Sequence, residues 1–295
     1  MTLISQIIQY AISGVTSGSI YAIVGICWST VFLISGVLNF ATGEFVMLGG
    51  MLTWAFSTSG MTLGAAAGLA IISTCIVAIL VERLVIHPIK HATEMVYMLV
   101  TIAAASVIKG LVLITCGTET HTISPVFSSK SIRILGATVM PQALFVLGVL
   151  AALMFSLHLF LNHTLFGKAL RASSINRTGA ELFGINVGRF RLFCFALAGG
   201  MGALAGIIIT PIAFTGYNVG LLASLKGLVV SIVGGWEIGN TVVAGLALGL
   251  LEGFFAGFVS TGWGDALSLG VMIVFLIGQT FDFGTLKRGI PTRGR

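Results

Sequence analysis

The sequence predicts an all-α protein, a polytopic transmembrane helical bundle of about eight or nine spans that forms a single domain over residues 1–295. Of these residues 57% are hydrophobic and only 8% are charged, and the mean hydropathy is +1.08. Soluble proteins carry about 25% charged residues. Four stretches without any charge each exceed the roughly 20 residues that a helix needs to cross a bilayer. They cover residues 1–43, 45–81, 134–167 and 192–225. A soluble enzyme, a nucleic-acid-binding protein and a disulfide-stapled secreted domain are therefore excluded.

Apolar segments separated by turn residues are the candidate spans, in chain order. They cover residues 7–34, 45–58, 62–81, 95–115, 141–161, 192–212, 223–236, 241–258 and 266–281. A polar interruption at 35–44 ends the first, Ser59-Gly60 ends the second, and Pro88 stops the third. Nine crossings follow if every segment spans the bilayer. If the two short segments are re-entrant, eight crossings with different ends remain the alternative.

Lysine and arginine concentrate in alternate loops, a pattern that indicates orientation in the membrane. The loops 83–94 and 162–191 and the tail 284–295 hold 11 of the 15 basic residues. These are Arg83, Lys90, Lys168, Arg171, Arg177, Arg189, Arg191, Lys287, Arg288, Arg293 and Arg295. Because cytoplasmic loops retain basic residues, we expect the N-terminus outside and the C-terminus in the cytoplasm. The net charge of +6 then reflects orientation, and no nucleic-acid partner is expected.

Two parts of the chain, 45–82 and 230–252, share a weak similarity. Each contains a Gly-Gly pair after an apolar run, then an Ala-Gly-Leu-Ala run, then a helical pattern that ends in glutamate. In the nine-span arrangement these parts cross in opposite senses, as in an inverted repeat. Chance recurrence is the alternative, since the chain holds 39 glycines.

The loop 162–191 contains two short amphipathic helical patterns, separated by Ser173, Ser174 and Asn176. Each pattern places lysine or arginine opposite an apolar side. Such a pair of helices on the cytoplasmic face is suited to a groove on a soluble partner. Lying flat on anionic membrane lipid is the alternative that the spacing leaves open.

Four runs together resemble the permease subunits of branched-chain amino acid ABC importers, most closely the first of the two related permeases. The runs are 38–49, 167–172, 180–187 and 195–206, and the resemblance covers nearly the whole chain. It implies uptake, across a bacterial inner membrane, of branched-chain or related amino acids or a similar small polar solute. A periplasmic binding protein would deliver the solute. The other implied partners are a second permease, identical or a paralogue, and two cytoplasmic ABC ATPases.

The resemblance also implies that residues 164–187 form the coupling helices that seat on the ATPase. The positions that match the family pattern are Gly167, Ala169, Arg171, Ala172, Ala180, Leu182, Gly184, Ile185 and Asn186. The chain itself lacks a P-loop, because Phe166-Gly167-Lys168-Ala169 has neither the first glycine nor the hydroxyl of that motif. We therefore expect a transport subunit that is not an enzyme and binds no cofactor, with ATP and Mg on the partner ATPases.

Two polar interruptions are candidates for the translocation pathway. Their residues are Asn39, Phe40, Thr42 and Glu44 in the first, and Trp236 and Glu237 in the second. Glu44 is the sole charge in the first 81 residues, and an ionisable group at membrane depth costs about 2.5–3.5 kcal/mol. It therefore faces a cavity or partner, unless it lies at the inner interface and caps a helix. If the repeat is real, Glu44 and Glu237 face each other across the pathway.

The sequence departs from the family pattern at both interruptions. The family usually has histidine where this chain has Thr42, and a Gly-Gly-x-Gly turn where it has Trp236 and Glu237. The first departure concerns the solute preference more than the assignment as a permease. Lys226 and Glu252, lone charges near apolar segments, are expected to be satisfied by pairing or snorkelling.

Other functions find little support in the residues. His87 and His91 are four apart, but Pro88 lies between them and no third ligand is evident, so no metal site is expected. The runner-up function is an ATP-independent secondary transporter or channel for a small solute. It would need an intramembrane proton or cation site, and intramembrane carboxylates are scarce. An intramembrane enzyme would need a catalytic constellation that the sequence does not show.

Overall fold

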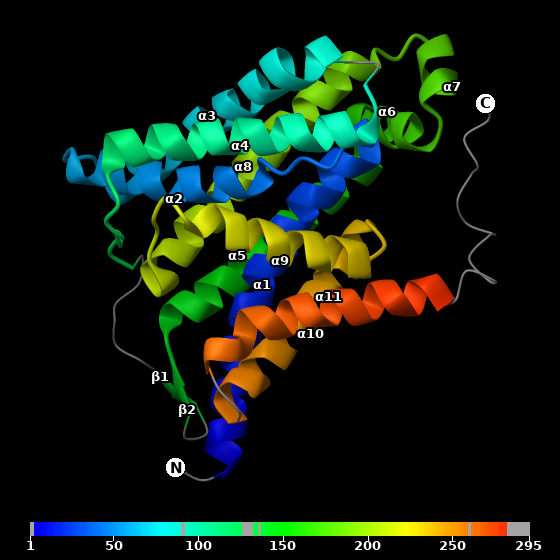
Figure 1. Ribbon diagram of the computed structural model, residues 1–295. Helices are drawn as coiled ribbons and strands as arrows, with labels where there is room; N and C mark the ends of the chain where they lie inside the picture. The colour runs from blue at the N-terminus through cyan, green and yellow to red at the C-terminus, as the bar shows by residue number, and fades with distance from the viewer. Residues whose placement is uncertain (1–2, 90–91, 126–131, 135–136, 259–260, 282–295) are drawn as a thin grey trace.

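The computed structural model describes residues 3–89, 92–125, 132–134, 137–258 and 261–281. Most of its helices run side by side across a bundle (Figure 1). The helices are α1 (Leu3–Ser35), α2 (Thr42–Thr58), α3 (Leu63–Leu80), α4 (Glu94–Cys116), α5 (Pro141–His163), α6 (Leu165–Ile175), α7 (Arg177–Leu182), α8 (Val187–Ala213), α9 (Val219–Val233), α10 (Ile238–Phe258) and α11 (Gly264–Phe281). Single turns of other helix types are the π-helical η1 (Val81–Ile86) and the 3₁₀ turns η2 (His87–Ile89) and η3 (Thr261–Trp263).

Each of the nine predicted apolar segments is a helix, so the predicted helical bundle is confirmed. Six helices in the described part of the chain are long and apolar enough to cross a bilayer, and α9 is a shorter apolar helix. The protein is therefore a multi-pass membrane protein. The sequence did not predict the small antiparallel hairpin of β1 (Ile132–Ile134) and β2 (Ala137–Val139). The Thr138 amide of this hairpin donates to the Gln9 side-chain oxygen of α1 at 2.8 Å.

Two helix boundaries differ from the prediction, and both differences involve a buried charge. The third span continues beyond residue 81 through η1 and η2, and Glu82 is buried within that extension. The span predicted to begin at 192 begins at Val187, one turn earlier, and it buries Arg191. Lys90, His91 and the tail 284–295, which carry predictions from the sequence, lie outside the described residues.

The bundle has two distinct ends, which Figure 1 shows at right and left. We call them the α6–α7 end and the β1–β2 end. The α6–α7 end also holds η1, η2 and the last turn of α11. The β1–β2 end also holds the first turns of α1 and the segment 117–125. The described parts of the basic loops, 83–89 with 92–94 and 162–191, therefore lie at the same end, as the predicted orientation requires.

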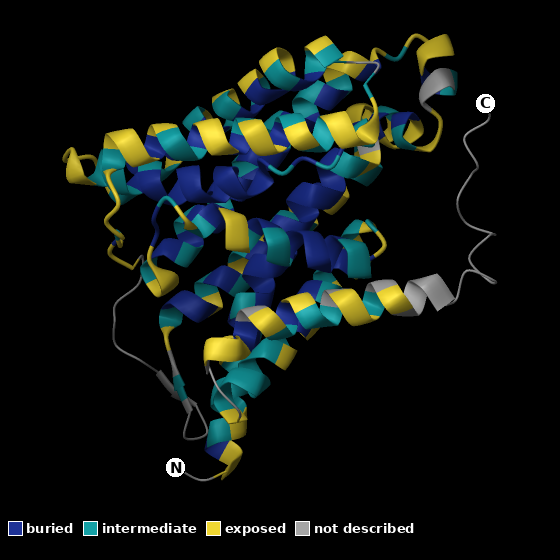
Figure 2. Ribbon diagram, in the orientation of Figure 1, coloured by how far each residue is buried: buried dark blue, intermediate teal, exposed yellow. Residues whose placement is uncertain are grey.

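Small residues bring the helix backbones into direct contact. On α1, Gly14 and Gly18 face α10, where a Cβ added to Gly249 would lie 2.3 Å from the Gly18 backbone. On α8, a Cβ added to Gly206 would lie 1.9 Å from the carbonyl oxygen of Val46 in α2. Helix association in lipid depends on such packing because lipid supplies no hydrophobic drive between helices. Figure 2 shows the result: α2 is buried along most of its length, whereas α4 and α11 carry exposed residues.

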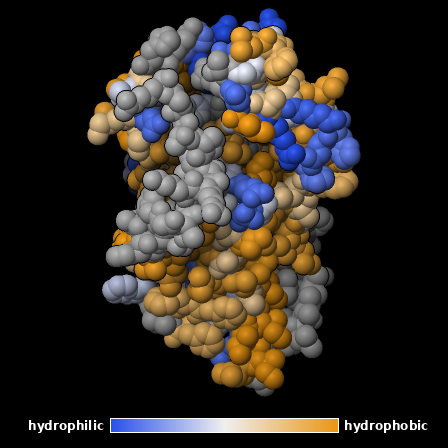
Figure 3. Space-filling view, turned by 90° about the vertical axis from the view of Figure 1, so that its right-hand side faces the viewer, coloured by the Kyte–Doolittle hydropathy of each residue, from blue (hydrophilic) through white to orange (hydrophobic). Residues whose placement is uncertain are grey.

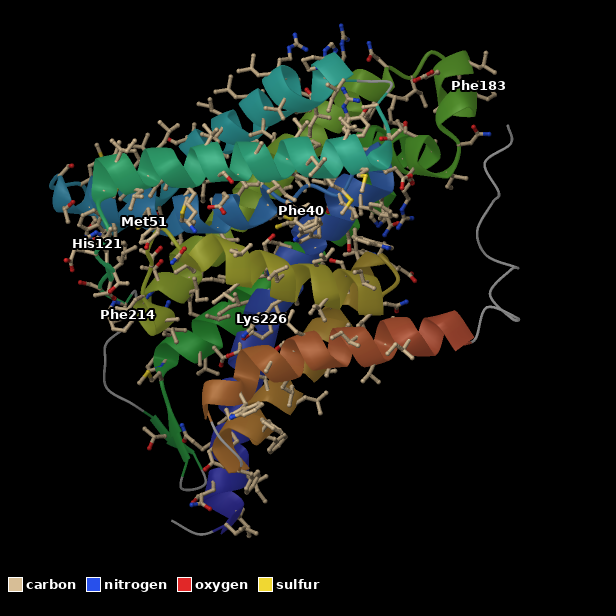
Figure 4. All side chains as sticks on the ribbon, in the orientation of Figure 1. Phe40, Met51, His121, Phe183, Phe214 and Lys226 are labelled. Carbon is tan, nitrogen blue, oxygen red and sulfur yellow. The ribbon has the colours of Figure 1, made fainter. Side chains whose placement is uncertain are left out.

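An ion pair ties four helices together inside the bundle. The Lys226 ammonium of α9 lies 2.8 Å from a carboxylate oxygen of Glu252 in α10. It also donates to the hydroxyl of Tyr21 in α1 at 2.9 Å, and Ser268 of α11 donates to the other Glu252 oxygen at 3.1 Å. Lys226 lies in the interior between the two ends of the bundle (Figure 4). The predicted pairing of these lone charges is confirmed.

The close approach of α8 to α2 at Gly206 can be tested by mutation. Gly206→Ala places a methyl group against the α2 backbone, so we expect the free energy of unfolding to fall by about 3 kcal/mol. Gly148→Ala in α5, where a Cβ meets nothing within 4 Å, is the matched control. Alanine favours a helix over glycine by about 1 kcal/mol, so the control should be neutral or stabilising. Thermal unfolding in detergent measures both, and equal midpoints for the two variants would contradict the close approach.

Candidate coupling surface and translocation pathway

Side-chain caps define the two short helices of the predicted coupling region. The Thr164 hydroxyl accepts from the Gly167 amide at 2.9 Å and begins α6. The Asn176 side chain accepts from the Gly179 amide at 2.9 Å and begins α7. Asn186 caps α8 in the same way through the Arg189 amide, at 3.2 Å. Such caps satisfy amides that have no partner inside the helix. The polar residues that separate the helical patterns in the sequence therefore mark the helix starts.

One side of α6 rests on the end of α5 and the other side is exposed. A Cβ added to Gly167 would lie 2.2 Å from the carbonyl oxygen of Phe160, and Leu170 is buried on the same side. Lys168 is exposed on the opposite side. Arg171 is also exposed, but it lies on the same face of the helix as Gly167, four positions before it. The amphipathic pattern predicted from the sequence is thus observed. Gly167 positions the helix on the bundle, whereas Lys168 faces outward.

The end of α7 presents apolar side chains to the surroundings. Leu182 is 85% exposed and Phe183 is 90% exposed. Gly184 follows with a φ of +78°, a conformation that favours glycine, and turns the chain back toward α8. Phe183 points away from the bundle in Figure 4. Phe183 is not among the residues predicted from the sequence, although its place at the apolar end of a short amphipathic helix was the available signal.

The structure divides the nine predicted coupling residues by exposure. Arg171, Ala172, Leu182, Gly184 and Asn186 are exposed, Ala169 and Ile185 are half-buried, and Gly167 and Ala180 are buried. Figure 3 views this end of the molecule. Hydrophilic atoms gather in the upper part of the face, at the height where Figure 1 places α6 and α7, and apolar atoms dominate below.

A buried ion pair connects the start of α8 to the π-helical turn η1. A guanidinium nitrogen of Arg191 lies 2.7 Å from a carboxylate oxygen of Glu82, and the Arg191 Nε also donates to that oxygen at 2.7 Å. Single π-helical turns occur often at functional sites. The chain runs from α7 through Gly184 and Asn186 directly into α8. The Arg191–Glu82 pair therefore links the predicted coupling region to the third span.

The chain between α1 and α2 is not helical although it lies inside the bundle. Residues 36–39 have no regular structure, and α2 begins at Thr42. Figure 4 places Phe40 in the interior, between the two ends. The Thr101 hydroxyl of α4 lies within 3.3 Å of both the Phe40 amide and the Leu38 carbonyl oxygen, so it partners this irregular backbone. Irregular backbone at membrane depth is tolerated only where protein or a water-filled cavity surrounds it.

The polar residues of this break are buried. The Asn39 side-chain oxygen accepts from the Ala41 amide at 3.1 Å, and the Thr42 hydroxyl donates to the Asn39 carbonyl oxygen at 2.8 Å. Glu44 is only 5% exposed, and its Oε2 has no hydrogen-bond partner. The Asn39 side-chain nitrogen is also without a partner. A buried polar atom without a partner is uncommon and calls for an explanation, such as water or a ligand.

The second predicted interruption forms the turn between α9 and α10. Trp236 has a φ of 65°, which is rare for a bulky residue. Its ring stacks on Phe32 of α1 with centroids 4.0 Å apart. Glu237 is exposed and accepts from the Asn240 side chain at 2.9 Å. Trp236 thus contacts α1 at Phe32. One turn earlier in α1, the Trp28 ring contacts the Phe40 ring edge-on, with centroids 5.4 Å apart.

Glu44 and Glu237 do not face each other, so that expectation is wrong. A Cβ added to Gly220, in the first turn of α9, would lie 2.8 Å from the Glu44 Oε2. Glu237 instead follows the last turn of α9, a helix of 15 residues that is about 20 Å long. The two carboxylates therefore lie toward opposite ends of α9.

The segments α2 and 215–224 nevertheless run in opposite directions. Gly50 lies against Thr215, and Gly43 lies against Gly220 and Ser224. This antiparallel contact is compatible with the predicted inverted repeat, which itself stays a prediction.

A polytopic bundle with a non-helical break in its interior and a two-helix surface at one end defines a membrane transport subunit. Comparison with known proteins identifies the kind of transport. Residues 10–276 match the model of a family described as "Branched-chain amino acid transport system / permease component". The chain belongs to this family, which confirms the resemblance seen in the sequence.

Individual relatives match along most of their length. The high-affinity branched-chain amino acid permease LivH of Escherichia coli K12 is 25% identical over 289 residues, 92% of each chain. LivH of Salmonella typhimurium is 27% identical over 291 residues, again 92% of each chain. The permease BraD of Pseudomonas aeruginosa is 25% identical over 294 residues, 94% of this chain and 95% of BraD.

A solved structure shares the fold. PsaBC from Streptococcus pneumoniae, in complex with Fab, superposes with a TM-score of 0.51 and covers 91% of this chain and 90% of its own. The sequence identity is 12%, so this likeness concerns the arrangement of the helices alone.

The buried Glu82–Arg191 pair leads to a second prediction. Glu82→Gln leaves the guanidinium of Arg191 buried without its countercharge, and we expect the free energy of unfolding to fall by about 3 kcal/mol. Replacing both residues with methionine removes the uncompensated charge and should recover most of that loss. Thermal unfolding of the purified protein checks both variants. A single variant as stable as the parent would mean that the pair is open to water.

Proposed function

We propose that this chain forms half of an ATP-driven pathway that imports branched-chain amino acids across the bacterial inner membrane. A second permease, identical or a paralogue, forms the other half. Two cytoplasmic ABC ATPases bind ATP and Mg and drive the cycle, and a periplasmic binding protein delivers the amino acid to the β1–β2 end. The chain acts as a transport subunit and catalyses no reaction of its own.

The exposed apolar surface of α7 is the observation that carries the coupling role. Leu182 and Phe183 are almost fully exposed, and the exposed cations Lys168 and Arg171 belong to the same α6–α7 end. Aromatic residues and arginine are enriched in the cores of protein interfaces. An amphipathic helix seats in a groove of its partner through such anchors. The groove that fits this surface belongs to the ATPase.

The positions of charge support an orientation with the N-terminus outside and the C-terminus in the cytoplasm. Arg83, Lys168, Arg171 and Arg189 are all exposed and belong to the α6–α7 end. Basic residues flank the cytoplasmic ends of spans. The coupling surface would then face the compartment that holds ATP.

Movement of α6 and α7 can reach the interior through covalent and electrostatic connections. The turn at Gly184 joins α7 to α8, and the Arg191–Glu82 pair joins α8 to η1. In turn, α8 packs along α2 through Gly202 and Gly206. ATPase closure would therefore shift α8 together with α2, the helix that follows the interior break. Rocking of packed helices around a central site is the usual basis of alternating access.

The role of Phe183 as an anchor can be tested by co-purification. Loss of a central interface aromatic costs about 2 kcal/mol, so Phe183→Ala should weaken ATPase binding roughly thirtyfold. Phe214→Ala is the matched control, because Phe214 is an exposed aromatic at the β1–β2 end. We expect the control to retain the ATPase. Equal loss in both variants, or in neither, would remove α7 from the interface.

Uptake by the assembled transporter tests the function itself. Proteoliposomes with both permeases, the ATPases and the binding protein should accumulate radiolabelled L-leucine only when ATP reaches the α6–α7 side. An ATPase variant without hydrolytic activity should abolish accumulation. Full uptake without any ATPase would instead support the ATP-independent transporter.

A further inference from the structure

A cavity lies directly beneath the proposed coupling surface. It has a volume of about 550 Å³ and is enclosed by α1, α5, α6, α8 and the turn between α9 and α10. Sites for small molecules typically have volumes of about 300–1,000 Å³. Because α6 forms one wall, anything bound in this cavity touches the coupling helix itself. The cavity is separate from the buried carboxylate of Glu44, which does not line it.

The walls of the cavity combine apolar side chains with two opposite charges. Leu157, Leu197 and Ile238 provide apolar surface from three different elements. Arg171 of α6 and Glu237 of the α9–α10 turn also line the cavity. Neither forms an ion pair within the described part of the chain, and Glu237 accepts a hydrogen bond from the uncharged Asn240 side chain. Neither charge is therefore neutralised by a countercharge there.

A buried hydroxyl in the cavity wall also lacks a partner. Thr30 of α1 is 7% exposed, and its Oγ1 makes no hydrogen bond. Two other wall residues, His158 and Asn162, hydrogen-bond to each other at 3.1 Å. Since buried polar atoms are nearly always hydrogen-bonded, a ligand or water that occupies the cavity would complete the bonding of Thr30.

We propose that this cavity binds an apolar amino acid from the cytosol. The inference rests on the proposed function, because the transported solute supplies the ligand. The α-carboxylate of the amino acid pairs with the Arg171 guanidinium, a geometry that allows two hydrogen bonds. The ammonium group pairs with Glu237, and the branched side chain lies among Leu157, Leu197 and Ile238. An apolar zwitterion thus matches the two opposite charges and the apolar surface of the wall.

Occupancy of this cavity slows the ATP-driven cycle. A bound amino acid connects α6 to α1, α5 and the α9–α10 turn and so restrains the helix that must move with the ATPase. Coupling between two binding events is reciprocal, so ATPase closure in turn weakens the affinity for the amino acid. A high amino acid concentration in the cytosol therefore fills the site, slows the ATPases and reduces further import.

The test uses the complete transporter in nanodiscs, which leave both faces accessible, without the binding protein. L-leucine at millimolar concentration should lower the ATPase rate at least fivefold. Leu197→Trp fills the cavity and should abolish this response. Leu204→Trp, at a half-buried leucine two turns further along α8 that lines a different cavity, is the matched control and should respond as the parent does.

A second variant guards against misfolding of the first. Glu237→Gln removes the partner of the ammonium group, and the half-inhibitory concentration of L-leucine should rise at least tenfold. A parent complex that imports L-leucine but whose ATPase ignores it would overturn this inference and leave the proposed function intact. A phospholipid retained by the parent and lost from Leu197→Trp, without any L-leucine response, would also overturn it. A complex that neither hydrolyses ATP nor imports would contradict the proposed function instead.

Discussion

Close backbone contact between helices is the interaction on which this bundle depends. In lipid, apolar side chains gain little by leaving one apolar environment for another, so association requires contact at short range. Glycines at the α1–α10 and α2–α8 crossings let the helix backbones come into direct contact. This packing encloses α2, and it allows a helix with a carboxylate in its first turn to lie in the middle of the protein.

The interior break and the α6–α7 end satisfy their non-helical backbone groups in two different ways. At the break, backbone groups that leave helical geometry find partners in the Thr101 hydroxyl and in the side chains of Asn39 and Thr42. At the α6–α7 end, the chain leaves the bilayer, and side-chain caps begin three successive helices within 23 residues, 164–186. The Arg191–Glu82 pair connects the start of α8 to the end of the third span without exposing a charge to lipid. Such a connection transmits movement, because separating two buried opposite charges costs a large amount of free energy.

Hydropathy and turn chemistry predicted the helices well, because each span must bury or expose a long apolar surface. The start of α8 was predicted five residues late, since Arg191 resembles a loop residue until its partner Glu82, 109 positions away, is known. The prediction that Glu44 and Glu237 face each other was wrong, because sequence similarity between two segments does not determine the distance between particular residues in them. Phe183 was missed because side-chain exposure depends on the turn at Gly184. The residues that match the family pattern predict a coupling region, but they did not separate Gly167, which packs on α5, from Arg171, which is exposed.

The central claim is that α6 and α7 lie in the cytosol and contact an ATPase. A photoreactive phenylalanine analogue at position 183 tests this claim in living cells, with the same analogue at Phe214 for comparison. The account predicts a covalent adduct with the ATPase subunit from position 183 and none from position 214. Adducts from position 183 with lipid alone, or with a protein outside the cytoplasm, would contradict it.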